Sequence, residues 1–383
     1  MAELTASNYL LGRLKKMGFL YLLLRILWRS AGKIWVESWR FLGVGVRFGG
    51  PRGFYSGLEQ VQQGSKEGRV IMNGQMLPTL HELSLIRLAG MNQNGRQPWP
   101  VFWLRQKETR LVGSSLAPLD ERNHMMIEAV YGEEFSRHDA SSNYAFLPPA
   151  IQLEGLWTSL IGAWSEGYYH WLTDALPRLA LLSEFSSETK ILIRGPLRKY
   201  QRDALAMMGL LDRVRESDER HLLVEDYYFS SPVCMTGCTN PLSVQWLRNQ
   251  FLRHASSEPT PTRFFIRREG KTRGITNQEE ICRYLESLGW AVIDLEHFSF
   301  ATQLALFSNA EDIIAEHGAS LTNLLWCRSG CRVLELCPDN FLNGCYEGIA
   351  LCNGLNHEFR IFPANGEFAF TIDPIILSKW ISG

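Results

Sequence analysis

The sequence predicts an α/β fold built around parallel sheets. From about residue 262 onward, short apolar segments alternate with segments whose apolar residues recur at helical spacing. A shorter alternation of the same kind lies between residues 167 and 229. With 383 residues, 45% of them hydrophobic and 21% charged, the chain has the composition of a globular protein and enough length for two or three cores. We therefore expect two α/β units that face each other across a cleft.

The C-terminal unit is predicted to span residues 262–383. Asn277 and Ser299 stand where helix N-caps belong, because each precedes a segment with helical periodicity, and Gly289 ends the first of these helices. The apolar runs between them are predicted strands. The predicted strands are 263–267, 290–295, 312–315 and 333–336, and the predicted helices are 277–289, 299–307, 320–327, 344–353 and 374–381.

An N-terminal α/β domain is predicted over residues 51–255. Residues 256–262, rich in Ser, Pro and Thr, form the predicted linker to the C-terminal unit. Residues 50–150 combine scattered Gly, Pro and Asn with short apolar runs and are interpreted as mixed α/β. Further along, the predicted helices are 168–185 and 198–211, and the predicted strands are 190–194, Val214 and 222–229.

Residues 1–50 form a separate basic segment that we expect to be helical. Residues 1–47 carry eight Lys or Arg side chains against two Glu, together with Trp28, Trp35 and Trp39. Its apolar run is shorter than the ~18 uninterrupted residues of a membrane span. A basic amphipathic helix on an anionic membrane surface accounts for this pattern, and so does a helix packed on the body with a solvated basic face. A signal peptide is disfavoured because no small-residue cleavage site follows.

Charge and cysteine content narrow the class of protein. The net charge of −1 leaves about −7 outside the basic segment, which argues against nucleic-acid binding by the body of the protein. None of the eight cysteines forms Cys-x-x-Cys, so they are interpreted as buried free thiols rather than metal ligands. The chain has no Asn-x-Ser/Thr sequon. We expect a cytoplasmic protein with peripheral membrane contact through residues 1–47.

The first candidate site lies on the helix that follows Gly167. His170, Asp174 and Arg178 are spaced four residues apart and are expected on one helix face, with Trp171 beside them. An imidazole next to a carboxylate provides the groups that deprotonate a hydroxyl. A helix-stabilising His–Asp pair at the surface is the structural alternative.

The second candidate is the loop 267–273, directly after a predicted strand. Its cations include Arg267, Lys271 and Arg273, and a loop at the carboxyl end of a parallel strand is where open α/β sheets bind ligands. Guanidinium groups match the geometry of phosphate oxygens. A solvated charged loop is the alternative.

The third candidate is the corner 316–323 between a strand and a helix. Small residues at Gly318, Ala319 and Ser320 allow backbone amides to approach an anion, and the helix N-terminus favours negative charge there. The corner is neither the dinucleotide fingerprint nor a P-loop. His317 is interpreted as part of the phosphate site, with a buried core histidine as the alternative.

Taken in order, these three segments resemble glycosyltransferase family 61. Residues 168–179 look like its His-Trp-x-x-Asp-x-Leu-Pro-Arg signature. Residues 265–268 with Arg273 and Asn277 are similar to its Ile-x-Arg…Arg…Asn segment, and residues 317–323 to its His-Gly-Ala-Gly-Leu-Thr-Asn. The resemblance covers about residues 150–380. It departs from the family at Ser320, which replaces the second glycine, and at Gln278, where Glu is common.

The resemblance implies an inverting, nucleotide-sugar-dependent transferase of the GT-B type, with two Rossmann-like domains and the donor held mainly by the C-terminal one. Family members use UDP-linked sugars such as N-acetylglucosamine, xylose or arabinose. By the same resemblance, Arg267 and Arg273 would contact the diphosphate, the backbone after His317 would cradle it, and Asn277 and Asn323 would support the loop and helix. We add Glu335, at the end of the next strand, as a candidate ribose contact.

Inverting transfer requires a base that deprotonates an acceptor hydroxyl opposite the leaving nucleotide. Asp174 is the preferred base from the sequence and His170 its partner, although the reverse assignment stays open. Arg178 and Trp171 would support them. No Asp-x-Asp occurs, so we expect no tightly bound metal or cofactor, only the nucleotide sugar and a glycan acceptor. The alternative function is a catalytically silent nucleotide-sugar-binding protein in a polysaccharide assembly complex.

Overall fold

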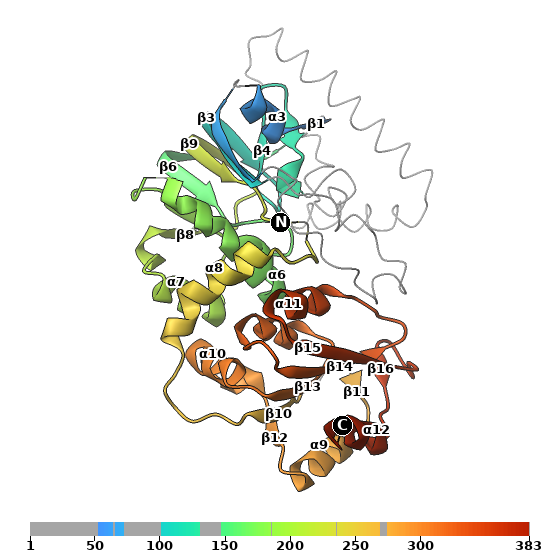
Figure 1. Ribbon diagram of the computed structural model, residues 1–383. Coiled ribbons are helices and arrows are strands. Elements are labelled where there is room, and N and C mark those ends of the chain that lie inside the picture. Colours follow the sequence, from blue (N-terminus) through green and yellow to red (C-terminus); the bar gives the residue numbers. More distant parts are fainter. Residues whose placement is uncertain are drawn as a thin grey trace, which may run out of the picture.

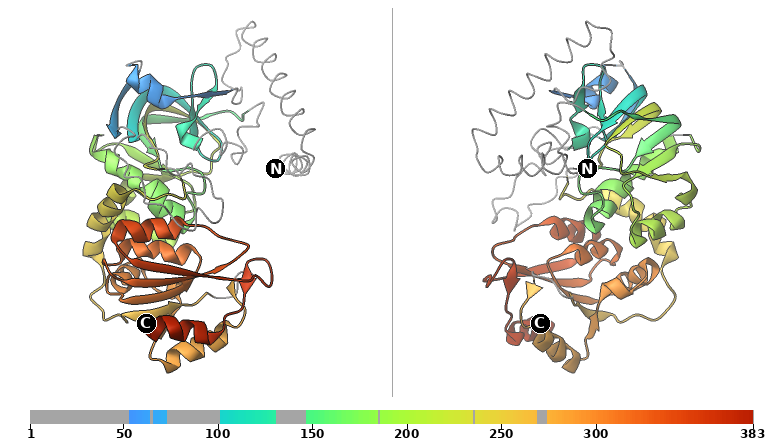
Figure 2. Two further views of the ribbon diagram at one scale, coloured as in Figure 1. Left: turned by 45° about the vertical axis from the view of Figure 1, so that its right-hand side comes forward. Right: turned by 180° about the vertical axis from the view of Figure 1, so that it is seen from behind.

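The computed structural model describes residues 53–63, 66–72, 101–130, 147–184, 186–234, 236–268 and 274–382. Two sheets, each with its helices, are stacked one above the other, and their helices meet between them (Figures 1 and 2). The basic segment 1–50, Lys271 and Arg273 lie outside the described residues. Within the described part of the chain, no helix has the length and apolarity that a bilayer crossing requires.

The first sheet has nine strands and two different halves. Its strand order is β1-β5-β4-β3-β9-β6-β7-β8, with β2 paired to β3. Strands β9, β6, β7 and β8 run parallel, whereas β2, β3 and β4 pair antiparallel with their neighbours. The strands are β1 Gly53–Tyr55, β2 Glu67–Met72, β3 Val101–Val112, β4 Ala117–Leu119, β5 His124–Met126, β6 Ile151–Ser159, β7 Lys190–Ile193, β8 Val214–Glu216 and β9 His221–Ser230.

The described residues between 53 and 130 contain more strand than the mixed α/β pattern predicted. The long strand β3 pairs with β9 over most of its length, and Arg105 holds Asp226 across the pair with bonds of 2.9 and 2.6 Å. The parallel half supports the predicted α/β unit, because helices connect β6 to β7 and β7 to β8. Two short helices precede the parallel half, namely α3 Gly57–Gln62 and η4 Glu128–Val130. The helices of the parallel half are α6 Tyr168–His170, η6 Trp171–Ala175, η7 Leu176–Glu184, α7 Lys199–Met207 and η8 Leu211–Arg213.

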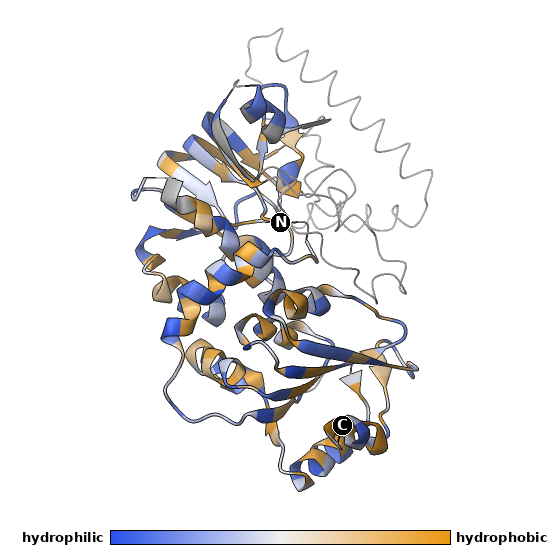
Figure 3. Ribbon diagram, in the orientation of Figure 1, coloured by the Kyte–Doolittle hydropathy of each residue, from blue (hydrophilic) through white to orange (hydrophobic). Residues whose placement is uncertain are grey.

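The second sheet is fully parallel, as predicted. Its order β12-β10-β13-β14-β15 is that of a doubly wound fold, and the strand order reverses between β10 and β13. The edge strand β15 is hydrophilic, as expected for an edge that faces water (Figure 3). The strands are β10 Arg263–Ile266, β12 Ala291–Ile293, β13 Asp312–Glu316, β14 Arg332–Pro338 and β15 Asn356–Phe362, with a small separate sheet of β11 Gly274–Ile275 and β16 Ala369–Phe370.

The helices of this second unit begin close to the predicted positions. Ser299 caps its helix by accepting a 3.1 Å hydrogen bond from the amide of Thr302. Asn277 is the N-cap residue of the helix that begins at Gln278, as predicted, but its side chain makes no cap bond. Its amide group instead bonds the backbone carbonyl and amide of Ile372. The helices of this unit are α9 Gln278–Ser287, η10 Leu295–His297, α10 Phe300–Ser308, η11 Ala319–Trp326, α11 Cys345–Asn353 and α12 Pro374–Ser382. Two further helices that were not predicted from the sequence, α8 Pro241–Phe251 and η9 Leu252–His254, precede the predicted linker.

Two predicted α-helices are irregular. The helical segment from Tyr168 to Glu184 begins as one α-turn, continues as a π-turn and ends as a 3₁₀-helix. Pro177 has no amide hydrogen to continue the regular ladder, and Thr173 donates its hydroxyl to the carbonyl of Tyr169 instead (2.9 Å). The segment after Gly318 is likewise a 3₁₀-helix rather than an α-helix.

One continuous hydrophobic core joins the two units. It includes Trp171 and Leu176 of the first unit, and Phe264, Phe307 and Trp326 of the second, all 0% exposed. Helix α8 packs against elements of both units, namely η7, η11 and α11. Burial of this shared surface fixes the carboxyl ends of β10 and β13 beside helix α6.

Candidate active site

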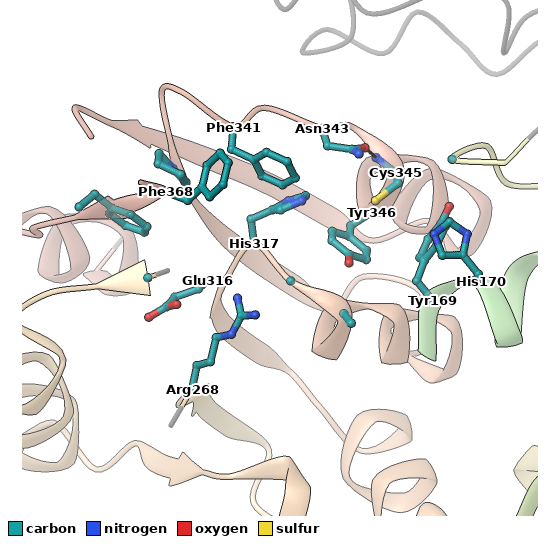
Figure 4. Close-up of a pocket in the computed structure, with 16 residues that line it drawn as sticks. Tyr169, His170, Arg268, Glu316, His317, Phe341, Asn343, Cys345, Tyr346 and Phe368 are labelled. Atoms are coloured by element: carbon teal, nitrogen blue, oxygen red, sulfur yellow. Dashed lines mark hydrogen bonds between the residues drawn. The ribbon is translucent and has the colours of Figure 1, made fainter. Parts of the chain in front are cut away.

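Two neighbouring pockets lie where the two units meet. The first, which we call the histidine pocket, has a volume of about 290 Å³ and is lined by Tyr169, His170, His317 and Tyr346 among others (Figure 4). The second, the arginine pocket, has a volume of about 490 Å³ and includes Lys199 and Arg267 in its wall. The two pockets share four lining residues, which are Arg268, Glu316, Gly318 and Ala319.

The shared wall stands at the point where the strand order of the second sheet reverses. Arg268 follows β10, and Glu316 and Gly318 end and follow β13, the strand beside it. Loops after adjacent strands on opposite sides of this point diverge and leave a crevice, because the helices that follow lie on opposite faces of the sheet. Two of the three segments singled out in the sequence therefore meet here.

His170 is held in one orientation by buried polar groups. Its Nδ1 is 2.8 Å from Oδ2 of Asp174, which also accepts a 2.7 Å bond from the hydroxyl of Thr236. The other oxygen of Asp174 lies 2.8 Å from the hydroxyl of Thr173, whose single proton it shares with the carbonyl of Tyr169. Asp174 is only 3% exposed, whereas the His170 side chain is 27% exposed. With Nδ1 as the donor to Asp174, Nε2 of His170 is the nitrogen left for the pocket.

Aromatic rings enclose the imidazole of His170. The Tyr169 ring lies edge-on at 5.2 Å and the Trp164 ring lies at 5.5 Å with a 35° tilt. Trp164 is 40% exposed and has a φ of 60°, a left-handed conformation that costs a non-glycine residue of order 1 kcal/mol. An exposed, strained tryptophan beside a histidine is a feature that the sequence did not reveal.

Arg178 does not continue the polar stripe that its spacing predicts. Its Nε donates to the carbonyl of Ser230 on β9 at 2.8 Å, and its guanidinium lies over the Phe229 ring. The π-turn after His170 rotates the following residues away from the straight-helix face. Trp171 is completely buried in the shared core. Both residues thus support the helix and lie away from the histidine pocket.

The corner after β13 contributes small residues to both pockets, so its backbone is accessible there. A Cβ added to Gly318 would lie 3.3 Å from Nη1 of Arg268, so the glycine allows that guanidinium to approach the chain. The first internal bond of the 3₁₀-helix runs from the amide of Leu321 to the carbonyl of Gly318, at 2.9 Å. The amides of Ala319 and Ser320 come before this bond, so they make no bond within the helix. Both residues line the arginine pocket.

The side chain of Asn323 is bonded to the corner and to three further residues. Its amide nitrogen donates to the carbonyl of Ser320 at 3.1 Å and to Gln303 at 3.2 Å. Its Oδ1 accepts a 2.7 Å bond from the hydroxyl of Tyr168 and a 3.0 Å bond from the indole of Trp326. The corner is therefore tied directly to the helix that carries His170.

The arginine loop contributes two described side chains. Arg267 lies 3.8 Å from the carboxylate of Glu279 and lines the arginine pocket. Arg268 lines both pockets, and its amide donates to Oε1 of Gln278 at 3.1 Å, so Gln278 orders the start of the loop. No separate role for Arg268 was predicted from the sequence, because only the tertiary structure shows which of two adjacent arginines lines both pockets.

Glu316 is the first residue of the predicted corner 316–323, but no role of its own was predicted for it from the sequence. It is 5% exposed and lines both pockets, and its Oε1 accepts a 3.0 Å bond from the amide of Ile275. Its Oε2 has no hydrogen-bond partner among the described residues. Gly274, with a φ of 123°, makes room for this carboxylate, because a Cβ there would lie 2.3 Å from Oε2.

Glu335 lies behind the histidine pocket rather than in its wall. It is 1% exposed, and its carboxylate is bonded to Nδ1 of His317 and, at 2.8 Å, to Nε2 of His357. The proposed ribose contact is therefore corrected, because both oxygens already have histidine partners. Within the described chain, His317, Glu335 and Cys337 also bring ligand atoms within 4.8 Å of one another, the spacing of a potential metal site.

The comparison with known families decides what this site belongs to. Residues 168–334 match the family model described as Glycosyltransferase 61. This region belongs to glycosyltransferase family 61. The match confirms the resemblance predicted from three separate motifs and supports glycosyltransferase activity. No curated protein matches the chain.

The glycosyltransferase 61 region contains the central parts of both pockets. It begins with α6, which carries His170, and ends within β14, just before Glu335. The outer wall of the histidine pocket, including Phe341, Tyr346 and Phe368, follows the matched region. The parts that position the imidazole of His170 and the arginine loop thus lie inside the family segment.

The pKa values of the two buried glutamates near the pockets are shifted in opposite directions. Burial raises the pKa of Glu316, and this effect outweighs the bond from Ile275 and the charge of Arg268. Burial alone would also raise the pKa of Glu335, but the hydrogen bonds from His317 and His357 lower it below its ordinary value. Glu335 is thus held as a carboxylate, whereas burial makes ionisation of Glu316 less favourable than that of an exposed glutamate.

Proposed function

We propose that this protein is an inverting glycosyltransferase of the GT-B type. It would transfer a sugar from a nucleotide sugar, with UDP as the expected nucleotide, to a hydroxyl group of a glycan or polysaccharide. The observation that carries the proposal is the shared wall of Arg268, Gly318 and Ala319 between two pockets, one of which is lined by His170 with Asp174 bonded behind it. The family match supports the glycosyltransferase class.

The donor would lie across both pockets. Aromatic residues in the arginine pocket, including Tyr200, Phe298 and Phe300, suit the faces of a nucleobase. The shared wall offers the Arg268 guanidinium and the opening amides of the 3₁₀-helix, which together suit a diphosphate. The sugar then extends into the histidine pocket. Glu316, which lines both pockets, takes the ribose-binding role first assigned to Glu335, since its Oε2 can accept from a hydroxyl.

We assign the base to His170 and a positioning role to Asp174. Asp174 is buried, is not among the residues that line the pocket and already accepts three hydrogen bonds, whereas His170 lines the pocket. In the transfer step, Nε2 of His170 takes the proton of the acceptor hydroxyl while that oxygen forms a bond to the anomeric carbon. The bond from the anomeric carbon to the diphosphate breaks, and its electron pair leaves with the nucleotide. Asp174 stabilises the imidazolium that results.

Trp164 marks the acceptor side of the reaction. Its exposed ring lies beside His170, and tryptophan faces provide flat apolar platforms on which sugar rings stack. A strained backbone at an exposed residue next to a proposed base is the kind of outlier that functional sites retain. We therefore place the acceptor sugar against Trp164, with its reacting hydroxyl toward His170.

A two-stage experiment tests this proposal. UDP, GDP and CMP sugars are first screened for thermal stabilisation of the purified protein, since a ligand that binds the native state raises its melting temperature. The stabilising sugar is then incubated with glycan acceptors, and NMR gives the anomeric configuration of the product. We expect an inverted product from the native protein and none from His170→Ala, which still binds the donor. Donor binding without transfer or hydrolysis by the native protein indicates a silent binding protein, and a retained configuration rules out the inverting mechanism.

A further inference from the structure

One residue that lines the arginine pocket has a buried carboxylate oxygen to which no described group donates. This residue is Asp294, whose side chain is 12% exposed. Its Oδ1 accepts a 3.1 Å hydrogen bond from the amide of Glu296 and so caps the short helix η10. Its Oδ2 has no hydrogen-bond partner among the described residues. A buried acceptor without a donor is unfavourable, so a ligand that brings a hydroxyl to Oδ2 gains free energy there.

A nearby histidine does not supply that donor. Nε2 of His297 lies 3.6 Å from Oδ2 of Asp294, which is beyond hydrogen-bond distance, and the His297 side chain is 74% exposed. An ion pair with a side chain in water contributes little to stability. Exposed side chains also change rotamer freely, so His297 can turn aside when a ligand enters. Oδ2 can therefore exchange this long contact for a true hydrogen bond.

The place of Asp294 in the sheet is that of a ribose-binding carboxylate. Strands β10 and β12 are the first two of the parallel sheet in chain order and lie side by side, with Ile266 paired to Ile293 (Figure 1). Asp294 is the first residue after β12. In doubly wound folds that bind dinucleotides, an acidic residue of the same strand–helix–strand unit accepts a hydrogen bond from the ribose 2′-hydroxyl. Topology and the unused Oδ2 thus indicate the same ligand group.

The distance across the sheet also suits a nucleoside. Arg268 after β10 and the corner after β13 form the proposed diphosphate site, and Asp294 lies on the other side of β10 from β13. Neighbouring strands are about 4.8 Å apart, so β12 is about 10 Å from β13. A ribose attached to that diphosphate has the length to reach the end of β12. Phe298 and Phe300 follow in the same segment and line the wall on which the base would stack.

We propose that Oδ2 of Asp294 accepts a hydrogen bond from the ribose 2′-hydroxyl of the donor, and that this contact restricts the enzyme to ribonucleotide sugars. The inference rests on the proposed function. Ribose has two hydroxyls, so Asp294 acts beside Glu316, which takes the 3′-hydroxyl from the shared wall. A deoxyribonucleotide sugar lacks the 2′-hydroxyl and would bury Oδ2 without a donor. The contact therefore excludes a class of donor, the deoxythymidine diphosphate sugars included.

Calorimetric titration with UDP and 2′-deoxy-UDP tests this contact without turnover, because the two ligands differ by one oxygen atom. We expect native protein to bind UDP about 10- to 100-fold more tightly, the value of one hydrogen bond to a charged group. Asp294→Ser keeps an N-cap side chain for the amide of Glu296 but has no second oxygen. This variant should bind the two ligands within about twofold of each other. Its preference for UDP over 3′-deoxy-UDP should stay native.

Two controls and a second variant accompany this titration. Asp373 also accepts a hydrogen bond at the start of a helix, from the amide of Ile375 on α12, but it is not among the residues that line either pocket. Asp373→Ser should therefore keep the native preference for UDP, and so should His297→Gln. Asp294→Asn keeps the shape of the side chain but puts an amide NH₂ in the place of Oδ2, so it should reduce the preference as well.

The outcomes distinguish this inference from the proposed function. Equal affinity of native protein for UDP and 2′-deoxy-UDP overturns the role of Asp294 and leaves the transferase intact. A native preference that both Asp294 variants retain, or that His297→Gln loses, overturns it as well. If the thermal screen selects GDP, then GDP and 2′-deoxy-GDP replace the UDP pair, since both nucleotides contain ribose. Failure of native protein to bind any of these nucleotides removes the proposed function together with the inference.

Discussion

The hydroxyl of Tyr168 donates a 2.7 Å hydrogen bond to Oδ1 of Asn323, a residue 155 positions away in the chain. This bond joins the first residue of α6 to the 3₁₀-helix that follows Gly318. His170 lies two residues after Tyr168, and Ser320 of the corner lies three residues before Asn323. The bond therefore sets the position of the proposed base relative to the proposed diphosphate site.

Tyr168→Phe should loosen this connection without creating a cavity. We expect a loss of about 1 kcal/mol of unfolding free energy, since one buried hydrogen bond is removed and the acceptor Oδ1 keeps Trp326 as a donor. Turnover should fall more than donor affinity. Denaturant unfolding and steady-state kinetics measure the two effects. Tyr284→Phe on α9 is the matched control, and an equal fall in both variants would remove the role of Tyr168.

His170 and Asp174 should differ in how their replacement affects the reaction. His170→Ala is expected to lower kcat by about 10²- to 10⁴-fold, the usual contribution of a general base, with UDP affinity unchanged. Asp174→Asn should also lower kcat, because an amide cannot stabilise the imidazolium. Thr236→Val, which removes one bond to Asp174, should have a smaller effect. Substantial turnover by His170→Ala would return the base role to Asp174.

Arg268 should matter more than Arg267 for the donor. Arg268 lines both pockets, whereas Arg267 lines only the larger one and lies 3.8 Å from Glu279. Arg268→Ala is expected to weaken UDP binding by about 10- to 100-fold, the value of a hydrogen bond between charged groups. Arg267→Ala should weaken it less. Calorimetric titration measures the affinities, and the exposed Arg283 on α9 provides an alanine control. Equal affinity in native protein and Arg268→Ala would move the diphosphate away from the shared wall.

The two buried glutamates should change stability with pH in opposite directions. The folded-state pKa of Glu335 is lowered, so its contribution is complete above the ordinary value of 4.5 and is lost as pH falls through the folded pKa. Glu335→Gln should therefore be destabilised at pH 7, by roughly 1–3 kcal/mol, and approach native protein in acid. Chemical denaturation across pH 3–8 gives the comparison.

Glu316→Gln should show the reverse. Its folded-state pKa is raised, so its favourable contribution is present at low pH and is lost as pH rises through the folded pKa. The amide oxygen can keep the bond from Ile275, and the neutral side chain avoids a buried charge. We expect this variant to equal or exceed native stability at pH 7 while binding UDP more weakly. Clear destabilisation at pH 7 would show that Oε2 is held by a structural contact.

Trp164→Ala should act on the acceptor alone. Loss of the stacking platform is expected to raise the KM for the acceptor by about tenfold, with the KM for the donor unchanged, since one aromatic contact contributes roughly 1–1.5 kcal/mol. Trp164→Phe should recover part of the loss. Initial-rate kinetics with each substrate varied separately measure both KM values. An unchanged acceptor KM in Trp164→Ala would place the acceptor elsewhere.

The parallel C-terminal sheet was largely predictable because its signals are local. Buried strands such as β13 appear as short continuous apolar runs, and a cap such as Ser299 precedes its helix directly. The N-terminal strands were less predictable, because β3 pairs with β9, more than 100 residues away in the chain. Such pairing depends on contacts distant in sequence. The helix after Gly167 was predicted, but its π and 3₁₀ turns were not, since helical spacing does not distinguish an α-turn from a π-turn.

By itself the sequence determined the α/β class, the three motifs and the family to which residues 168–334 belong. The motifs were recognisable because each is a short segment whose residue types and spacing are fixed along the chain. Only the tertiary structure decided which side chains face the pockets. It moved Glu335 behind His317, brought Arg268 and Glu316 into the shared wall, and placed Asp174 behind His170. Such assignments depend on strand order and on the burial of one common core, which sequence spacing does not encode.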